Sequence, residues 1–182
     1  MMTQRILVIS DSHARDANIR RVLKREGPFD RLCHLGDAQC TQEEMEKLAH
    51  CPVEMIAGNC DLFCDLPMAR IISLGKYRAL MVHGHQHFVS LGPELLKEDA
   101  RKNGCDIVLY GHTHVPMDDI TDPDVWVFNP GSISLPRQKG GEPSYMVIEV
   151  KEDGSIREEV RFLQKAQKTV RIQGFWDDIF GK

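Results

Sequence analysis

The sequence lacks the long apolar runs that membrane-spanning and exported proteins carry. No stretch of its 182 residues approaches about 18 consecutive apolar residues. Arg5 follows the first methionine too closely for the apolar core of a signal peptide to form before Ser10. There is also no repeat, no low-complexity tract and no linker rich in glycine, proline and serine. We therefore predict a cytoplasmic protein that does not interact with a membrane.

A basic excess, which supplies phosphate contacts in nucleic-acid-binding proteins, is missing as well. The formal net charge is −4, so long duplex nucleic acid is not an expected partner. Phosphate chemistry remains compatible with this balance, because bound metal ions would reverse the local field. The glycine patterns of Walker and Rossmann loops are absent. Nucleotide-driven motors and dehydrogenases therefore have no support.

The six cysteines form no C-x-x-C pair. In a cytoplasmic chain we expect them to be reduced and mostly buried. The segment from Cys64 to Arg70 matches the bare C-x5-R pattern of cysteine-dependent phosphatases, whose loop must aim backbone N–H groups at an anion. Here Pro67 removes one donor, Asp65 adds a repelling charge and no glycine is present. We reject that interpretation.

What is present is an ordinary globular composition, with 42% hydrophobic and 27% charged residues. A chain of this length can bury a full core in a single domain. Apolar runs alternate with amphipathic stretches, which predicts strands interleaved with helices and hence an α/β fold. We place one domain at residues 1–164 and a C-terminal tail of unknown role at 165–182. The large apolar residues of this tail would need to be shielded from solvent: Phe175, Trp176, Ile179 and Phe180.

The local pattern predicts three helices and eight strands. Asp16 is the expected N-cap of the first helix, and Thr41 with Glu44 forms a capping box for the second. The expected helices span residues 16–26, 41–50 and 93–103. Short apolar strands are expected at 6–9, 32–35, 53–57, 79–82 and 107–110. Three antiparallel strands joined by glycine-rich turns are expected at 125–128, 145–150 and 156–163.

Polar residues follow each of the first five predicted strands directly. The five segments are Ser10-Asp11-Ser12-His13, Gly36-Asp37, Gly58-Asn59-Cys60-Asp61, His83-Gly84-His85 and Gly111-His112-Thr113-His114. Each segment alone is typical of an ordinary turn. A purely structural role, however, gives no reason for such segments to recur at successive strand ends. Because the carboxyl ends of strands form the ligand crevice of α/β sheets, we predict that all five share one site.

The types of donor at this site predict its chemistry. The candidate ligands offer two carboxylates, one amide oxygen and four imidazoles: Asp11, His13, Asp37, Asn59, His83, His112 and His114. Seven donors are too many for one tetrahedral zinc ion and suit two divalent ions that share a carboxylate. The mixed nitrogen and oxygen set favours Mn²⁺, Fe, Ni²⁺ or Zn²⁺ over Ca²⁺ or Mg²⁺. Two such ions about 3.5–4 Å apart are suited to hydrolysing a phosphate ester.

These motifs, in this order, resemble those of the calcineurin-like metallophosphoesterase superfamily. The chain resembles in particular the small single-domain prokaryotic phosphodiesterase branch. The resemblance runs from about Gln4 to about Leu163 and includes the motif Asn129-Pro130-Gly131-Ser132. The resemblance implies a four-layer α/β/β/α sandwich of two mixed β-sheets flanked by helices. It also implies two divalent metal ions, with Mn²⁺ expected first and Ni²⁺, Fe or Zn²⁺ as alternatives.

The resemblance further implies a role for each ligand. Asp37 would bridge the two metals, and a bridging hydroxide would attack phosphorus without a covalent enzyme intermediate. The first metal would be held by Asp11, His13 and His114, and the second by Asn59, His83 and His112.

One position departs from the pattern of many superfamily members, which have histidine where this chain has Cys60. A thiol is a poorer acid partner, so we expect substrates with good leaving groups unless another group supplies the proton. His85 is our candidate catalytic residue, in contact with the substrate phosphate. Asp61 fits a supporting role and a turn equally well, and we expect His87 to lie in a loop.

The predicted function is hydrolysis of a small phosphodiester by a dinuclear metal centre. One alternative is a metal-binding interaction scaffold, because the retromer subunit with this fold works chiefly as a scaffold after losing metal ligands. Here all seven ligand positions are filled, which disfavours that role. A nuclease or nucleotide phosphatase acting on short substrates is the other alternative. An exposed aromatic tail would fit a homo-oligomer, and a tail packed on its own domain fits equally well.

Overall fold

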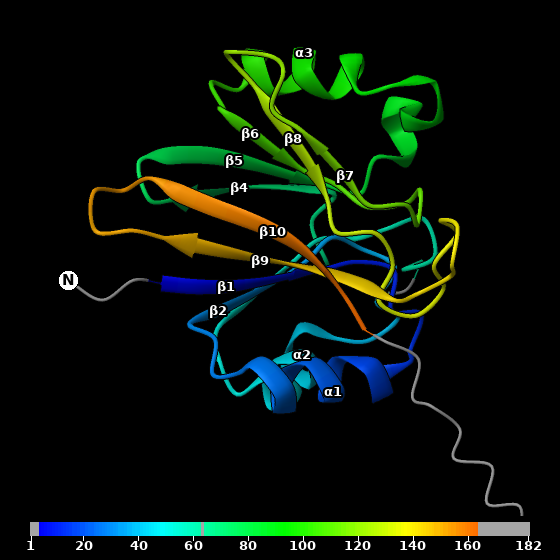
Figure 1. The fold of residues 1–182 in the computed structure, drawn as a ribbon. Helices are drawn as coiled ribbons and strands as arrows, with labels where there is room; N and C mark the ends of the chain where they lie inside the picture. Colours follow the sequence, from blue (N-terminus) through cyan, green and yellow to red (C-terminus); the bar gives the residue numbers. More distant parts are fainter. Residues whose placement is uncertain (1–3, 63, 164–182) are drawn as a thin grey trace, which may run out of the picture.

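The computed structural model describes residues 4–62 and 64–163, which form two β-sheets packed face to face (Figure 1). The first sheet consists of β1 (Gln4–Ile9), β2 (Arg31–His34), β3 (Val53–Met55), β9 (Ser144–Val150) and β10 (Ile156–Phe162). The second sheet consists of β4 (Ala69–Leu74), β5 (Tyr77–Val82), β6 (Ile107–Leu109), β7 (Met117–Asp119) and β8 (Trp126–Asn129).

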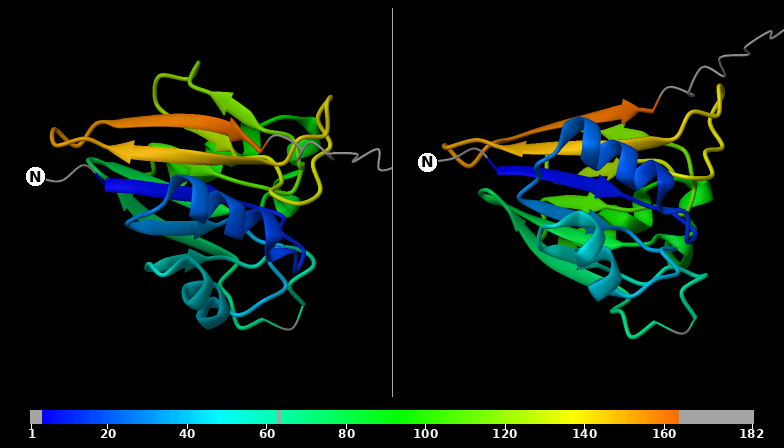
Figure 2. Two further views of the ribbon diagram at one scale, coloured as in Figure 1. Left: turned by 60° about the horizontal axis from the view of Figure 1, so that its bottom comes forward. Right: turned by 90° about the horizontal axis from the view of Figure 1, so that it is seen from below.

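Helices cover the outer faces of both sheets. In the described part of the chain these are α1 (Asp16–Glu26), α2 (Gln42–Ala49) and α3 (Glu94–Lys102). The first two lie on the first sheet and α3 lies on the second (Figures 1 and 2). Two short 3-10 helices, η1 (His85–His87) and η2 (Val89–Leu91), connect β5 to α3. The predicted four-layer α/β/β/α sandwich is thus confirmed.

The strand order brings many strand ends to one edge of the molecule. The order is β10-β9-β1-β2-β3 in the first sheet and β4-β5-β6-β8-β7 in the second. β1, β2 and β3 are parallel, and so are β5, β6 and β8. Their carboxyl ends therefore meet at the same edge, where α/β sheets bind ligands.

The central strand β1 shows how one apolar run serves two core layers. Ile6 and Val8 are fully buried in the cluster between the sheets. Leu7 and Ile9 are fully buried in the cluster beneath α1 and α2. Successive side chains of a strand point to opposite faces, so a strand covered on both sides is apolar throughout. A third cluster, which includes Val108, lies beneath α3.

The three predicted helices are confirmed, with ends within one residue of those expected. The capping box is present: Thr41 Oγ1 accepts from the Glu44 N–H at 3.2 Å, and the Glu44 carboxylate accepts from the Thr41 N–H at 2.9 Å. The prediction of Asp16 as N-cap is wrong. Arg15 occupies that position without a side-chain cap, and Asp16 begins the helix, where its carboxylate lies 3.7 Å from Arg20 Nη2.

Two strands were not predicted, and the pairing predicted for a third is wrong. β4 was not predicted, because the polar residues Arg70 and Ser73 leave only a short apolar run. β7 was not predicted either, since it has only three residues and two of them are aspartates. β8 was expected to pair with the later strands, but it lies in the second sheet between β6 and β7. Only β9 and β10 form the expected antiparallel pair of neighbouring strands.

The cysteines are all free, as expected, but they are not mostly buried. Cys33 and Cys105 are buried, whereas the other four are half-buried. No helix within residues 4–62 and 64–163 combines the length and the apolar character that crossing a bilayer requires. The predicted tail at 165–182 lies outside the described residues, so the domain boundary at 164 stays a prediction.

Candidate metal centre

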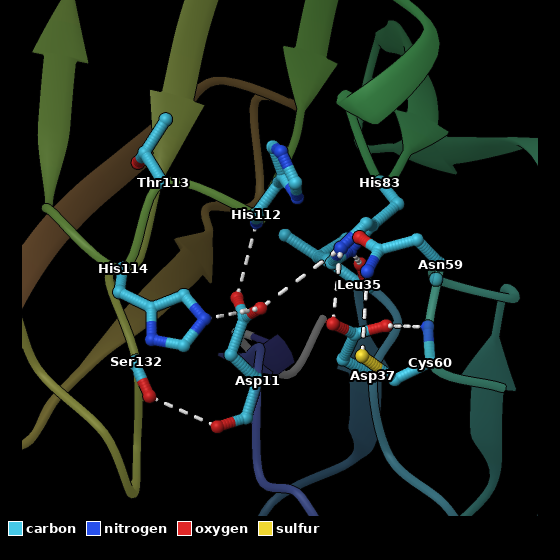
Figure 3. Close-up of polar contacts among 12 residues, drawn as sticks. Asp11, Leu35, Asp37, Asn59, Cys60, His83, His112, Thr113, His114 and Ser132 are labelled. Atoms are coloured by element: carbon cyan, nitrogen blue, oxygen red, sulfur yellow. Dashed lines mark hydrogen bonds and ion pairs between the residues drawn. The ribbon is translucent and has the colours of Figure 1, made fainter. Parts of the chain in front are cut away.

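The predicted ligand residues come together between the two sheets, at the edge where the parallel strands end (Figure 3). The first sheet contributes Asp11 and His13 after β1, Asp37 after β2 and Asn59 after β3. The second sheet contributes His83 after β5, and His112 and His114 after β6. The convergence that the sequence predicted for these segments is therefore seen in the structure. Their assignment as metal ligands stays a prediction.

Five of these side chains form the centre of the site. Asp11 Oδ1 lies 3.1 Å from His114 Nε2 and 3.9 Å from His83 Nε2. Asp37 Oδ2 lies 3.5 Å from His83 Nε2 and 3.9 Å from His13 Nε2. The Nε2 atoms of His13 and His114 are 3.5 Å apart. Each carboxylate thus has one oxygen between two imidazoles, an arrangement that suits a ligand shared by neighbouring ions.

The second oxygen of each carboxylate is held by the backbone. Asp11 Oδ2 accepts from the His112 N–H at 3.1 Å, and Asp37 Oδ1 accepts from the Cys60 N–H at 2.7 Å. These bonds cross between neighbouring loops, because His112 follows β6 and Cys60 follows β3. They fix the rotation of both carboxylates and leave Asp11 Oδ1 and Asp37 Oδ2 facing the imidazoles.

Backbone carbonyls orient two of the histidines. His83 Nδ1 donates to the Leu35 carbonyl at 2.7 Å, and His114 Nδ1 donates to the Leu135 carbonyl at 2.6 Å. A carbonyl can only accept, so Nδ1 carries a proton, and Nε2 has a free lone pair whenever the ring is neutral. Such partners fix the tautomer and ring orientation of metal-binding histidines. The Nε2 atoms accordingly face Asp11 and Asp37.

The remaining two predicted ligands border this centre. The His112 ring stands nearly edge-on to the His83 ring, with centroids 5.2 Å apart. Asn59 is exposed, and its Nδ2 donates to Cys60 Sγ at 3.3 Å. Figure 3 shows the Asn59 side chain beside His83 and Asp37. With its amide nitrogen so engaged, the Asn59 carbonyl oxygen is free to act as a ligand.

Two buried atoms at the centre lack the partners that such atoms normally have. Asp11 Oδ1 and His83 Nε2 are fully buried, and neither has a hydrogen-bond partner among the described residues. Buried polar atoms without partners are costly, so their presence calls for an explanation. A divalent cation would supply the missing interaction to both atoms. The donor set and these two atoms therefore fit a bound metal.

Burial and charge act against each other on the ionisable groups. Burial favours the neutral form of Asp11, but His114 and His83 outweigh it and hold the pKa of Asp11 below its ordinary value. For Asp37, burial is outweighed by His83 and the Cys60 N–H, so its pKa lies well below the usual range. Burial would lower the pKa of His83, yet Asp37 and Asp11 raise it. Both carboxylates are therefore ionised and ready to hold a cation.

Asp61 connects the loops after β2 and β3. Its Oδ2 accepts from the N–H groups of Asp37 at 2.6 Å, Gly58 at 2.8 Å and Ala38 at 3.3 Å, and its Oδ1 accepts from Gln39 at 2.7 Å. Successive N–H groups that converge in this way form an anion-binding concavity. The sequence left the role of Asp61 open. The structure shows that it supports the backbone of the predicted bridging carboxylate.

Two glycines are required by close packing at the site. A Cβ on Gly58 would lie 2.1 Å from Asp37 Oδ1, and a Cβ on Gly111 would lie 2.0 Å from Ser10 Oγ. Neither position has room for a side chain, because the atoms it would meet belong to the site itself. Glycine therefore permits a close backbone approach at both strand ends.

The loop after β8 braces the site from the second sheet, a role that sequence reasoning did not assign. Asn129 Nδ2 donates to the Gly111 carbonyl at 2.9 Å and to Thr113 Oγ1 at 3.1 Å. Ser132 Oγ donates to the Asp11 carbonyl at 2.9 Å (Figure 3). The available signal was the Asn-Pro-Gly-Ser run that directly follows a predicted strand.

His85, the predicted catalytic residue, lies at the border of the centre. Its ring centroid is 5.6 Å from that of His83 and 6.2 Å from that of His112. Burial, reinforced by His83, lowers its pKa. Its catalytic role stays a prediction. His87 lies in η1 rather than in a loop. Its Nε2 lies 3.2 Å from Asp99 Oδ2 of α3.

The cysteines nearby do not form a phosphatase loop. Arg70 belongs to β4 and pairs with Glu54, and Cys64 Sγ donates to the Cys40 carbonyl at 3.7 Å. Burial raises the pKa of Cys64, whereas a nucleophilic cysteine needs a lowered one. Burial and the Asp37 carboxylate raise the pKa of Cys60 to about 11. The rejection of thiol-based catalysis agrees with this geometry.

Known proteins resemble the chain in sequence. The profile of the calcineurin-like phosphoesterase superfamily domain matches residues 4–153. The chain is 30% identical over 162 residues to the probable metallophosphoesterase YsnB of Bacillus subtilis. The aligned region covers 88% of this chain and 91% of that protein. It is 34% identical over 110 residues to phosphodiesterase YfcE of Escherichia coli K12. This aligned region covers 56% of this chain and 54% of that protein.

Solved structures resemble the chain in fold. A conserved uncharacterized protein of Streptococcus pneumoniae TIGR4, described as a predicted phosphoesterase, has a TM-score of 0.71 at 28% identity, covering 88% of this chain and 99% of that one. Vps29 of Cryptosporidium parvum has a TM-score of 0.69 at 19% identity, covering 91% of this chain and 100% of that one. At that identity the likeness to Vps29 concerns the fold alone, and a fold does not define an activity.

Proposed function

The chain belongs to the calcineurin-like phosphoesterase superfamily, and on this premise we propose that it hydrolyses small phosphodiesters with two divalent metal ions. Relatives named metallophosphoesterase and phosphodiesterase support the reaction class. The observation that carries the proposal is the pair of unpartnered buried atoms, Asp11 Oδ1 and His83 Nε2, at the centre of the ligand cluster. A cation bound at the centre would interact with both atoms.

Each ligand residue has a distinct task in this proposal. Asp11, His13 and His114 hold one ion, and Asn59, His83 and His112 hold the other. Asp37 is shared, because its Oδ2 faces both His13 and His83. Ions bound there supply an activated water and stabilise charge on the reacting phosphate. Mn²⁺ is our first expectation, and the same nitrogen and oxygen donors also suit Ni²⁺, Fe and Zn²⁺.

We assign His85 to substrate contact rather than to metal binding. Its Nδ1 has no hydrogen-bond partner within the described residues, and its ring borders those of His83 and His112. In this proposal it binds a phosphate oxygen beside the centre. Small phosphodiesters are favoured over long duplex nucleic acid by the net charge of −4. The cytoplasmic location and a homo-oligomeric state stay predictions.

The test combines metal content with hydrolysis of bis(p-nitrophenyl) phosphate. Wild type is compared with Asp37→Asn, before and after chelation and after addition of Mn²⁺ or Ni²⁺. Asp118→Asn is the matched control, because Asp118 is an exposed carboxylate on β7. We expect about two ions per wild-type chain, hydrolysis that chelation abolishes, and loss of both properties in Asp37→Asn only. Metal bound without hydrolysis of any ester would favour a scaffold, and a wild type without metal would refute the proposal.

A further inference from the structure

Cys60 lies beside the proposed metal centre although it is not one of the seven predicted ligands. One donor atom each from His13, Asp37 and Cys60 lie within 4.8 Å of one another. These residues come from the loops after β1, β2 and β3, so three separate elements bring them together. No other cysteine of the described ranges belongs to such a group.

The position of this thiol is fixed by the ligands themselves. The Cys60 N–H donates to Asp37 Oδ1 at 2.7 Å, which ties the residue to the carboxylate that faces both ion positions. Cys60 Sγ accepts from Asn59 Nδ2 at 3.3 Å, so the same sulfur orients a predicted ligand (Figure 3). The residue is half-buried. Its sulfur is thus held beside two predicted ligands, His13 and Asp37.

Sulfur distinguishes metals that nitrogen and oxygen donors do not separate well. Thiolates are soft ligands that Zn²⁺ and other thiophilic ions prefer, whereas Mn²⁺ is suited to carboxylates and imidazoles. We propose that Cys60 is an additional, metal-selective ligand that joins His13 and Asp37 when a thiophilic ion fills the centre, but not when Mn²⁺ does. The thiol proton passes to water as the sulfur–metal bond forms. This inference rests on the metal centre proposed above.

The test is a titration of the chelated full-length protein with Co²⁺ and Cd²⁺, followed by ultraviolet absorption. Thiolate-to-metal charge transfer gives an absorption band that carboxylates and imidazoles do not produce. We expect the band in wild type and its loss in Cys60→Ser and Cys60→Ala. Cys64→Ser is the matched control, because Cys64 is also half-buried in the segment between β3 and β4 but lies outside the donor group. Equilibrium dialysis counts the ions bound to each variant.

Affinity provides a second readout that does not depend on activity. We expect Cys60→Ser to weaken Cd²⁺ binding by about tenfold or more, as removal of a supporting ligand interaction typically does. The affinity for Mn²⁺ should fall much less than the affinity for Cd²⁺ in the same variant. A band that persists in Cys60→Ser, or that is absent from wild type with ions bound, would overturn the role of Cys60 and leave the metal centre intact. A wild type that binds no ion would overturn both.

Discussion

His83 and His114 couple metal binding to pH, because an imidazole must lose its proton before it can hold a metal ion. Burial lowers the pKa of each ring, but Asp11 and, for His83, Asp37 outweigh it and raise both pKa values. A raised pKa keeps the ring protonated to higher pH. Metal affinity should therefore be full above this pKa and fall as the pH drops through it.

We expect the apparent affinity for Mn²⁺ to fall by about tenfold or more between about pH 8 and about pH 6, a range that brackets the ordinary histidine pKa. Isothermal titration calorimetry in two buffers of different ionisation enthalpy would give both the affinity and the protons released. An affinity that does not change over this range, with no proton release, would contradict the assignment of these two histidines.

Cys60 should limit the range of leaving groups, because its thiol is a poor proton donor. Burial and Asp37 raise its pKa to about 11, so it stays protonated and donates weakly at neutral pH. Cys60→His should raise the hydrolysis rate of diphenyl phosphate more than that of bis(p-nitrophenyl) phosphate. The ratio of the two rates should change by up to about 10²-fold, which is the lower end of the contribution of a positioned general acid. Cys60→Ser is the control, and an unchanged ratio in Cys60→His would refute this explanation.

Asp61 acts on its neighbours through the backbone of two loops. Asp61→Ala leaves four N–H donors without their acceptor at a site where Asp61 is only 5% exposed. We expect a loss of about 3 kcal/mol in the free energy of unfolding, as for hydrogen bonds to a buried charged group. Urea unfolding of the chelated protein measures this loss.

If Asp61 positions Asp37, its loss should also weaken metal binding, which a purely structural role would not predict. If it sets the place of Asp37, Asp61→Ala should weaken Mn²⁺ binding even in the fraction that remains folded. Asp61→Asn should recover part of the affinity, because its carbonyl oxygen can still accept from the Asp37 N–H. Asp65→Asn tests a carboxylate of the same segment that makes none of these bonds. Lower stability with unchanged affinity would show a merely structural role.

The helices and the apolar strands were predictable because their signals are local. The capping box of Thr41 and Glu44 identified the start of α2, and the apolar run of β1 identified a strand buried on both faces. β7 has no such signal, since two of its three residues are aspartates and it pairs with β8 at the edge of a sheet. The sheet to which β8 belongs depends on pairing with β6, which no local pattern reports.

The site was predictable as a set of residue types, but its construction was not. Polar residues after successive strands indicated convergence, and they do converge. The sequence could not indicate that the donors divide between two sheets, nor that Asn129 and Ser132 brace the loops from a distant segment. Those features depend on contacts across 18 and 121 positions of the chain. They arise from the packing of the whole molecule rather than from local sequence.

Because the two sheets share one ligand cluster, a bound metal should stabilise the fold as a whole. Asp11 and Asp37 follow strands of the first sheet, and His83 and His114 follow strands of the second, so bound ions would link the sheets at one edge. A ligand that binds only the folded state at 100 times its Kd adds about 2.7 kcal/mol. For a domain of this size that gain corresponds to about 5–10 °C in Tm.

We therefore expect saturating Mn²⁺ to raise the Tm of the chelated wild type by about 5–10 °C in differential scanning fluorimetry. Asp37→Asn should show little or no shift, because it removes the carboxylate that faces both ion positions. The exposed-carboxylate control Asp118→Asn should shift as wild type does. Equal shifts in all three proteins would mean that Mn²⁺ binds elsewhere, and the centre between the sheets would lose its main support.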